Sequence, residues 1–151
     1  MIGGSFEGLN LRGANLNGTI LQAVKMFGVN VYASDFQQAD LRGVEIDECF
    51  FSQVNFCESN LSSSLIAGVN IVETNMSKTE IVDASLVRVQ LREVNLREAN
   101  LSRTELFINE MSEVDLKGAN LNIKSFNSDI SLRDLCASDN IIHNFIYEAI
   151  L

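Results

Sequence analysis

An apolar residue recurs at every fifth position of this chain from Phe6 to Phe126. The position is occupied by Phe, Leu, Ile, Met or Val throughout, which gives 25 units without a break in phase. A helix repeats its apolar positions about every 3.6 residues and a strand every second residue, so neither explains a strict period of five. The pattern therefore predicts a repeat protein, in which each unit buries its apolar residue by stacking against neighbouring units.

A second column of small or β-branched residues lies two positions before the central apolar residue in nearly every unit, as at Val24, Ala39 and Val94. Large and small residues in alternation fit a narrow interior in which bulky side chains meet near the axis. The residue between the two columns is often Asn or Asp, as at Asn55 and Asn75. These residue types suit tight turns and can stack as hydrogen-bonded ladders, so this position is expected at the outer surface.

The clearest units resemble the A(D/N)LXX signature of the pentapeptide repeat family, over roughly four fifths of the chain. They are Ala14-Asn15-Leu16, Ala39-Asp40-Leu41, Ala99-Asn100-Leu101 and Ala119-Asn120-Leu121. The resemblance implies an all-β fold, a right-handed quadrilateral parallel β-helix with four units per coil, about six coils and roughly 30 Å long. Residues 1–128 are assigned to this solenoid. Leu9, Asn109 and Lys124 depart from the small-residue column, so distortion or the end of the solenoid is expected there.

The repeat loses its phase after Phe126, and residues 129–151 are predicted to form a different element. Apolar residues there follow the spacing of an amphipathic helix, with Ser138 or Asp139 as a candidate N-cap. The apolar positions are Ile141, Ile142, Phe145, Ile146 and Ile150. A helix that caps the open end of the solenoid is one interpretation, because such an end exposes core residues and unpaired strand edges. A homodimer formed through the same helix is the alternative, which the family resemblance keeps open.

One predicted wall carries apolar residues where solvent would be expected. If four units make a coil, the outward positions on the wall of Met26, Ile66 and Leu106 include a set of large apolar side chains. They are Phe27, Leu65, Val87, Phe107 and Ile108. Exposed apolar patches on soluble proteins usually mark contact sites, so this is the candidate interaction surface. Cover by the terminal segment, or ordinary scattered surface hydrophobes, are the alternatives.

The next wall carries a candidate acidic column of Glu73, Glu93 and Glu113, with Glu110 nearby and Arg92 as partial compensation. Like charges one coil apart repel each other. The column is either a binding feature or a solvated face, since surface charge costs little at physiological salt.

Charge and composition limit the classes of partner. The chain has 20 acidic and 11 basic residues and a net charge of −9. Nucleic acids and anionic membranes require Lys and Arg against phosphate, so neither is an expected partner, whereas a neutral or basic protein surface is. There is no basic and apolar leader pattern and no apolar run of about 18 residues, which leads us to expect a cytoplasmic protein.

The residues do not favour an enzyme, a metal site or a cofactor. Catalysis needs converging acid, base or nucleophilic groups, and the sequence has a single histidine, His143. Cys49, Cys57 and Cys136 have no metal-ligand spacing and are expected to be reduced thiols.

These observations favour a non-enzymatic protein–protein interaction scaffold. The family resemblance implies an alternative, an acidic rod that mimics DNA and binds DNA gyrase or topoisomerase IV, which would protect against quinolones or toxins. Counted by wall, the acidic residues of the repeat number five, four, four and three, so no wall is strongly polarised.

Overall fold

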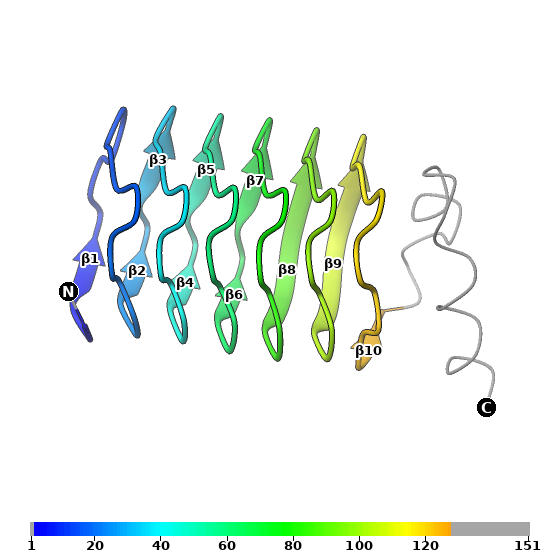
Figure 1. The fold of residues 1–151 in the computed structure, drawn as a ribbon. Coiled ribbons are helices and arrows are strands. Elements are labelled where there is room, and N and C mark those ends of the chain that lie inside the picture. The colour runs from blue at the N-terminus through cyan, green and yellow to red at the C-terminus, as the bar shows by residue number, and fades with distance from the viewer. Residues whose placement is uncertain (1, 128–151) are drawn as a thin grey trace.

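The computed structural model describes residues 2–127, which form a parallel β-solenoid of about six coils (Figure 1). The strands of this part are short, and the two longest turn a corner of the coil. They are β1 (Ser5–Glu7), β2 (Lys25–Phe27), β3 (Asn30–Tyr32), β4 (Glu45–Asp47), β5 (Phe50–Ser52), β6 (Leu65–Ala67), β7 (Asn70–Val72), β8 (Ser85–Arg92), β9 (Glu105–Ser112) and β10 (Ser125–Phe126). The predicted helix with Ile141, Ile142, Phe145, Ile146 and Ile150 lies outside the described residues.

The strand register shows that four units make one coil. Met26 pairs with Ile46 and Phe51 pairs with Ile71, and the single bridges outside the strands, such as Asp40 to Asn60, also join residues 20 apart. The predicted four-sided parallel solenoid is therefore confirmed. We call its walls face 1, with central residues Phe6, Met26, Ile46, Ile66, Leu86, Leu106 and Phe126, and then faces 2, 3 and 4 in chain order, which begin with Leu11, Leu16 and Leu21.

Faces 1 and 2 carry the strands, while faces 3 and 4 are joined by single bridges such as Asp35 to Asn55 and Asp40 to Asn60. On faces 3 and 4 most units end in a β-turn closed by a backbone hydrogen bond, as from the Ala39 N–H to the Phe36 carbonyl (3.0 Å). The third residue of this turn, Gln38, has a φ of 57°. One residue per unit with a left-handed backbone conformation turns the chain sharply, and four such turns close the coil.

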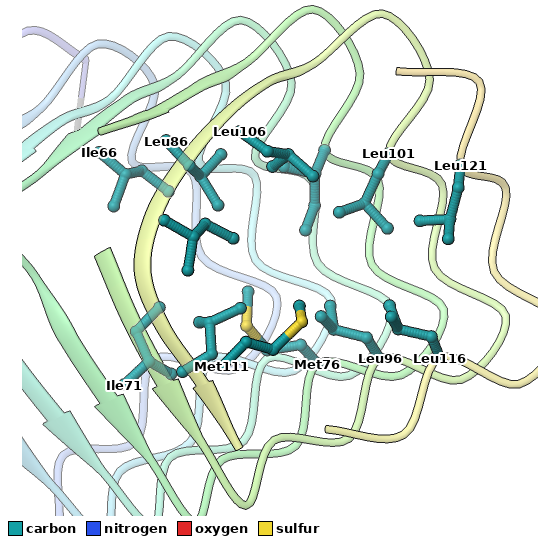
Figure 2. Close-up of a pocket in the computed structure, with 13 residues that line it drawn as sticks. Ile66, Ile71, Met76, Leu86, Leu96, Leu101, Leu106, Met111, Leu116 and Leu121 are labelled. Atoms are coloured by element: carbon teal, nitrogen blue, oxygen red, sulfur yellow. The ribbon is translucent and has the colours of Figure 1, made fainter. Parts of the chain in front are cut away.

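The interior is a column of apolar side chains. All central residues from Leu21 to Leu106 are buried, as are Leu116 and Leu121. The remaining central residues at the two ends are half-buried: Phe6, Leu11, Leu16, Met111 and Phe126. Phe56 contacts two other aromatic rings, Phe36 with ring centroids 5.0 Å apart and Phe51 at 5.5 Å. Figure 2 shows how Ile, Leu and Met side chains point to the axis from all four faces in the later coils. The space left between them is about 20 Å³ and wholly apolar, so it is a packing void rather than a ligand site.

The chain shifts by one residue at Asn109, where distortion was expected. Val87 pairs with Phe107, but Val89 pairs with Ile108, and the register returns where Gln90 pairs with Glu110. Asn109 is therefore left unpaired, bulges outward and is exposed. Ile108 takes the inward position and is only 1% exposed. An amide in the apolar interior would lose its hydrogen bonds, so the strand buries the preceding isoleucine instead. The prediction that Ile108 belongs to the outer surface is therefore wrong.

Asn127 supports this shifted strand from the next coil. Its Nδ2 donates to the Ile108 carbonyl (3.0 Å), and the Ile108 N–H donates to its Oδ1 (3.1 Å). One amide side chain thus pairs with both backbone groups of the residue below, as a further strand residue would. The other two departures differ in setting: Leu9 is exposed in the first coil, and Lys124 is exposed and pairs with Glu105 (2.7 Å).

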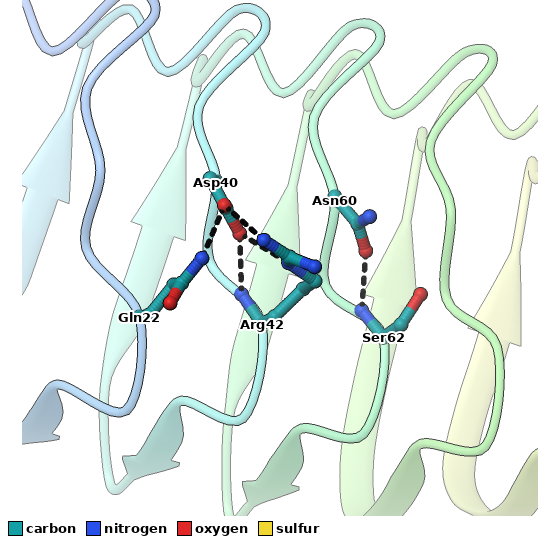
Figure 3. A network of polar contacts seen from close by, with 5 residues as sticks. All are labelled: Gln22, Asp40, Arg42, Asn60 and Ser62. Carbon is teal, nitrogen blue, oxygen red and sulfur yellow. Dashed lines mark hydrogen bonds and ion pairs between the residues drawn. The ribbon is translucent and has the colours of Figure 1, made fainter. Parts of the chain in front are cut away.

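Asp40 on face 4 is held in a polar network that its neighbours in the column lack (Figure 3). The Arg42 guanidinium donates to both carboxylate oxygens (2.8 and 2.7 Å), and Gln22 Nε2 donates from the coil before (2.6 Å). One coil on, the Oδ1 of Asn60 accepts only the Ser62 N–H (2.9 Å) among these groups. The hydrogen bonds from Arg42 hold the pKa of the Asp40 carboxyl well below its usual range, against the opposing effect of burial.

Asp40→Asn is expected to lower the unfolding midpoint at pH 7 by about 2–5 °C, as for the loss of one well-formed surface ion pair. Because the folded-state pKa of Asp40 is depressed, its stabilisation is present above the unfolded pKa of about 4 and fades as the pH falls below it. The difference between wild type and variant should therefore shrink between pH 5 and pH 2. Thermal unfolding across this range measures it. Arg42→Gln should remove the same pH dependence, and a constant difference at all pH values would contradict this role.

Candidate interaction surface

Face 1 presents a row of exposed apolar side chains, which we call the apolar strip: Phe27, Leu65, Ala67, Val87 and Phe107. Phe27 is 50% exposed, Leu65 47% and Phe107 39%, while Ala67 and Val87 are half-buried. The strip runs over β2, β6, β8 and β9, whose alternate residues point outward because the central residue points inward. The predicted exposure is confirmed for Phe27, Leu65 and Phe107.

The register places most of the strip side by side. Ala67 pairs with Val87, and Val87 pairs with Phe107, so three rungs are continuous. Phe27 is separated from Ala67 by one rung, where Asp47 lies on β4. Leu65 is on the same strand as Ala67, on the other side of the buried Ile66. The strip therefore spans five successive coils with a single polar interruption.

Charged residues border the strip on both sides. On one side Lys25 pairs with Glu45 (2.8 Å), and Lys124 pairs with Glu105, which holds the pKa of the Glu105 carboxyl below its usual value. On the other side Glu48 and Arg88 stand at corner positions, both exposed and each without an ion pair or side-chain hydrogen bond among residues 2–127. Leu65 stands in the first of these rows, and the rest of the apolar strip lies between the two.

Face 2 has a shallow depression that sequence reasoning did not single out. It has a volume of about 200 Å³, and Phe50, 40% exposed, lies at its edge. The other lining residues are Asn70, Val72, Gln90, Arg92 and Glu110. The signal for Phe50 was present, since it stands directly before a central residue, a position whose side chain points outward. The depression is open and gathers no acid–base pair with a nucleophile.

The acidic column lies at the corner after face 2. Glu73, Glu93 and Glu113 are exposed and have φ values of 49°, 55° and 54°, so each occupies the turn position of its unit. Gln53 Nε2 donates to Glu73 (2.8 Å), and Arg92 lies 3.9 Å from Glu93. Glu110 lies apart from this corner, on the wall of face 2.

Reactive groups are sparse in the part of the chain that the structure describes. Within residues 2–127 there is no cluster of three or more metal-ligating side chains, and no helix there is long and apolar enough to cross a membrane. Cys49 is buried, which raises the pKa of its thiol, and it donates to the Asp47 carbonyl (3.3 Å). Cys57 is half-buried and accepts from the Ser77 hydroxyl (3.4 Å). His143 and Cys136 lie outside the described residues.

Comparison with solved structures gives several proteins of similar fold. A trypsin-treated variant of QnrB1, a plasmid-mediated fluoroquinolone resistance protein, aligns with a TM-score of 0.51 and 22% identity over 87% of this chain and 76% of that one. HetL, involved in heterocyst differentiation regulation in Nostoc sp. strain PCC 7120, gives 0.41 and 13% over 85% and 91%. Rfr23 from the cyanobacterium Cyanothece 51142 gives 0.36 and 21% over 83% and 90%. A search of curated protein sequences found no match.

The sequence profile of pentapeptide repeats matches eight copies in this chain, in residues 2–31, 34–71 and 84–122. These segments make up well over half of the sequence, and they coincide with the coils described above. The chain belongs to the pentapeptide repeat family.

Proposed function

We propose that this protein is a non-enzymatic interaction module that binds another protein on face 1. The observation that carries the proposal is the exposure of Phe27, Leu65 and Phe107 on one flat wall. Large apolar side chains that share one surface of a soluble protein usually mark a contact site. Aromatic residues are also enriched among the side chains that dominate binding energy at protein interfaces.

The dimensions of face 1 suit a protein rather than a small molecule. Phe27 and Phe107 stand four coils apart, or about 19 Å at the usual spacing of paired strands. Small-molecule sites are usually concave and enclose most of their ligand, whereas the walls of this solenoid are flat. The same flatness, together with the scarcity of converging reactive groups within residues 2–127, supports a binding role over a catalytic one.

Changing Phe27 and Phe107 to serine together should reduce the capture of a protein partner from a lysate of the source cells at least tenfold. Each phenylalanine removed from an interface costs roughly 1–3 kcal/mol of binding free energy, and two together exceed a factor of ten. The measurement is quantitative mass spectrometry of proteins retained on the immobilised chain.

Phe50→Ser is the matched control, because Phe50 is equally exposed but lies on face 2. It should leave the capture unchanged. If the double variant retains the same proteins as the wild type, face 1 is not the docking surface and attention moves to face 2.

Mimicry of DNA is the second candidate, supported by the acidic column, by the family, and by the fold that this chain shares with a fluoroquinolone resistance protein. The charge density of the rod argues against this function, because it is lower than that of DNA. Four of the 20 acidic and one of the 11 basic residues lie outside residues 2–127, which leaves 16 acidic and ten basic side chains on the rod. A net charge of −6 over about 30 Å is one charge per ~5 Å, against one per ~1.7 Å of DNA.

A supercoiling assay with DNA gyrase, with and without a fluoroquinolone, decides between the two. Inhibition or protection at micromolar protein that is lost when Glu73, Glu93 and Glu113 are changed to Gln would establish the mimic. No effect at these concentrations would remove it.

A further inference from the structure

We propose that the partner which face 1 fits best is a second copy of this chain, packed face to face with the two rods antiparallel. The inference rests on the proposed role of face 1 as a docking surface and names its occupant. It follows from the order of residues along the wall, which is self-complementary about the coil of Leu65 and Ala67.

The geometry of such a pair is fixed by symmetry. A twofold axis along the strand direction turns one face 1 over onto another, so that each outward column faces itself while the order of coils is reversed. A residue two coils before the axis then lies opposite the residue two coils after it. Contacts of this kind are isologous, and they close on a dimer.

With the axis at the coil of Ile66, the apolar strip meets itself except at Val87, which faces Asp47 of the second copy. Leu65 faces Leu65 of the second copy and Ala67 faces Ala67, at the centre of the interface. Phe27 and Phe107 stand two coils before and two coils after this centre. Phe27 of each copy therefore faces Phe107 of the other. All the large exposed side chains of the strip are therefore covered by apolar groups.

The charged borders also match in this register. Glu48 stands one coil before the centre and Arg88 one coil after it, at the same corner, so each of these unpaired side chains faces its opposite charge. Lys25 and Glu105 stand two coils before and after, in the other row, and face each other. At a separation of about 10 Å between packed sheets, Glu and Arg side chains are long enough to meet.

Other arrangements lose this match. A shift of one coil in one direction places Glu45 opposite Glu105 of the second copy. A shift in the other direction places Glu45 opposite Leu65 and leaves Glu48 opposite Gly68. Parallel rods related by an axis along the solenoid bring Glu45 opposite Asp47. Like charges in opposition cost binding energy, so the antiparallel register is preferred.

The size of the interface predicts a weak dimer. Five coils give a contact about 24 Å long, and three residues of a strand give a width of about 10 Å. Because protruding side chains add to the contact area, the accessible surface buried is on the order of 400 Å² per copy, about half that of a standard stable interface. Dissociation constants in the range of tens to hundreds of micromolar are expected, as for small transient contacts.

Sedimentation velocity of the full chain from about 1 to 500 µM measures the association. The wild type should shift reversibly from monomer to dimer. Glu48→Arg and Arg88→Glu should each raise the dissociation constant roughly tenfold or more, because the symmetry replaces two attractive contacts by two repulsive ones. An equimolar mixture of the two variants should associate as well as the wild type, since each chain then offers the charge that the other lacks. The double variant E48R/R88E should also recover.

Two controls make the same changes of charge elsewhere. Glu113→Arg and Lys78→Glu alter corner positions of other walls and should leave association unchanged. The second copy is excluded if the wild type stays monomeric up to the highest concentration, if the controls weaken the dimer as much, or if the mixture fails to recover. A monomeric chain that still captures another protein through Phe27 and Phe107 overturns only this inference. A chain that neither self-associates nor captures a protein overturns the docking role as well.

Discussion

Replacement of Phe56 by alanine is expected to lower the free energy of unfolding by about 3–5 kcal/mol, the usual cost of deleting a buried phenylalanine. Phe56 is 3% exposed and is the only described residue whose ring contacts both Phe36 and Phe51. The axis around it is tightly filled, so neighbours from the coils before and after cannot collapse into the space without moving the backbone ladder. The lost contacts therefore include two aromatic pairs in addition to the transfer of the ring from water.

Urea unfolding followed by circular dichroism measures this change. Phe50→Ala is the matched control, because Phe50 is also a phenylalanine but lies on β5 next to Phe51, points outward and is 40% exposed. Its cost should stay below about 1 kcal/mol. If both variants lose the same stability, the buried Phe56 contributes no more than an exposed phenylalanine, and the assignment of Phe56 to the core is wrong.

The fold was predictable because each repeat unit meets the same surroundings. Phe36, Phe56 and Met76 occupy equivalent positions on face 3, so one local rule, an apolar residue every five positions, describes them all. The number of units per coil does not follow from that rule. It came from the family resemblance, and the pairing of Met26 with Ile46 confirms it.

Ile108 shows where a local rule fails. The period assigns it to a corner, yet burying Asn109 would cost more than one irregular turn, so the strand slips and Ile108 packs inside. The sequence contained a warning, since Asn109 was already out of place in the small-residue column. The repeat pattern does not show that the Asn127 side chain, one coil later, hydrogen-bonds the backbone of Ile108 and so stabilises the shifted strand.

The candidate surfaces were predictable as positions but not as contacts. The five-residue period identifies the outward positions, which include Phe27 and Phe107 and equally include Phe50. The ion pairs depend on side-chain rotamers and on neighbours 20 residues away. Arg103, for example, donates two hydrogen bonds of 2.7 Å to the Asp83 carboxylate. Arg88 has no such neighbour, and only the structure shows that it is exposed and makes no ion pair within residues 2–127.

A ladder of amide side chains runs along face 3, and it carries the last prediction. Asn75 Nδ2 donates to Asn55 Oδ1 (3.2 Å), and Asn95 Nδ2 donates to Asn75 Oδ1 (3.1 Å). The same Oδ1 accepts the Ser77 N–H (3.2 Å), which fixes the turn of its own unit. Asn75 therefore joins three coils and one corner with a single, half-buried side chain.

Asn75→Ala is expected to cost about 2–3 kcal/mol, since it removes three hydrogen bonds and leaves two donors, on Asn95 and Ser77, without these acceptors. Asn15→Ala is the control from the same column, because the exposed Asn15 accepts only the Asn17 N–H (3.1 Å) and should cost below about 1 kcal/mol. Asn75→Asp keeps the acceptor but loses the donor, so it should fall between the two. Equal costs for Asn75→Ala and Asn15→Ala in chemical unfolding would mean that each amide acts only within its own turn. Coils would then be held together by the backbone and the core alone.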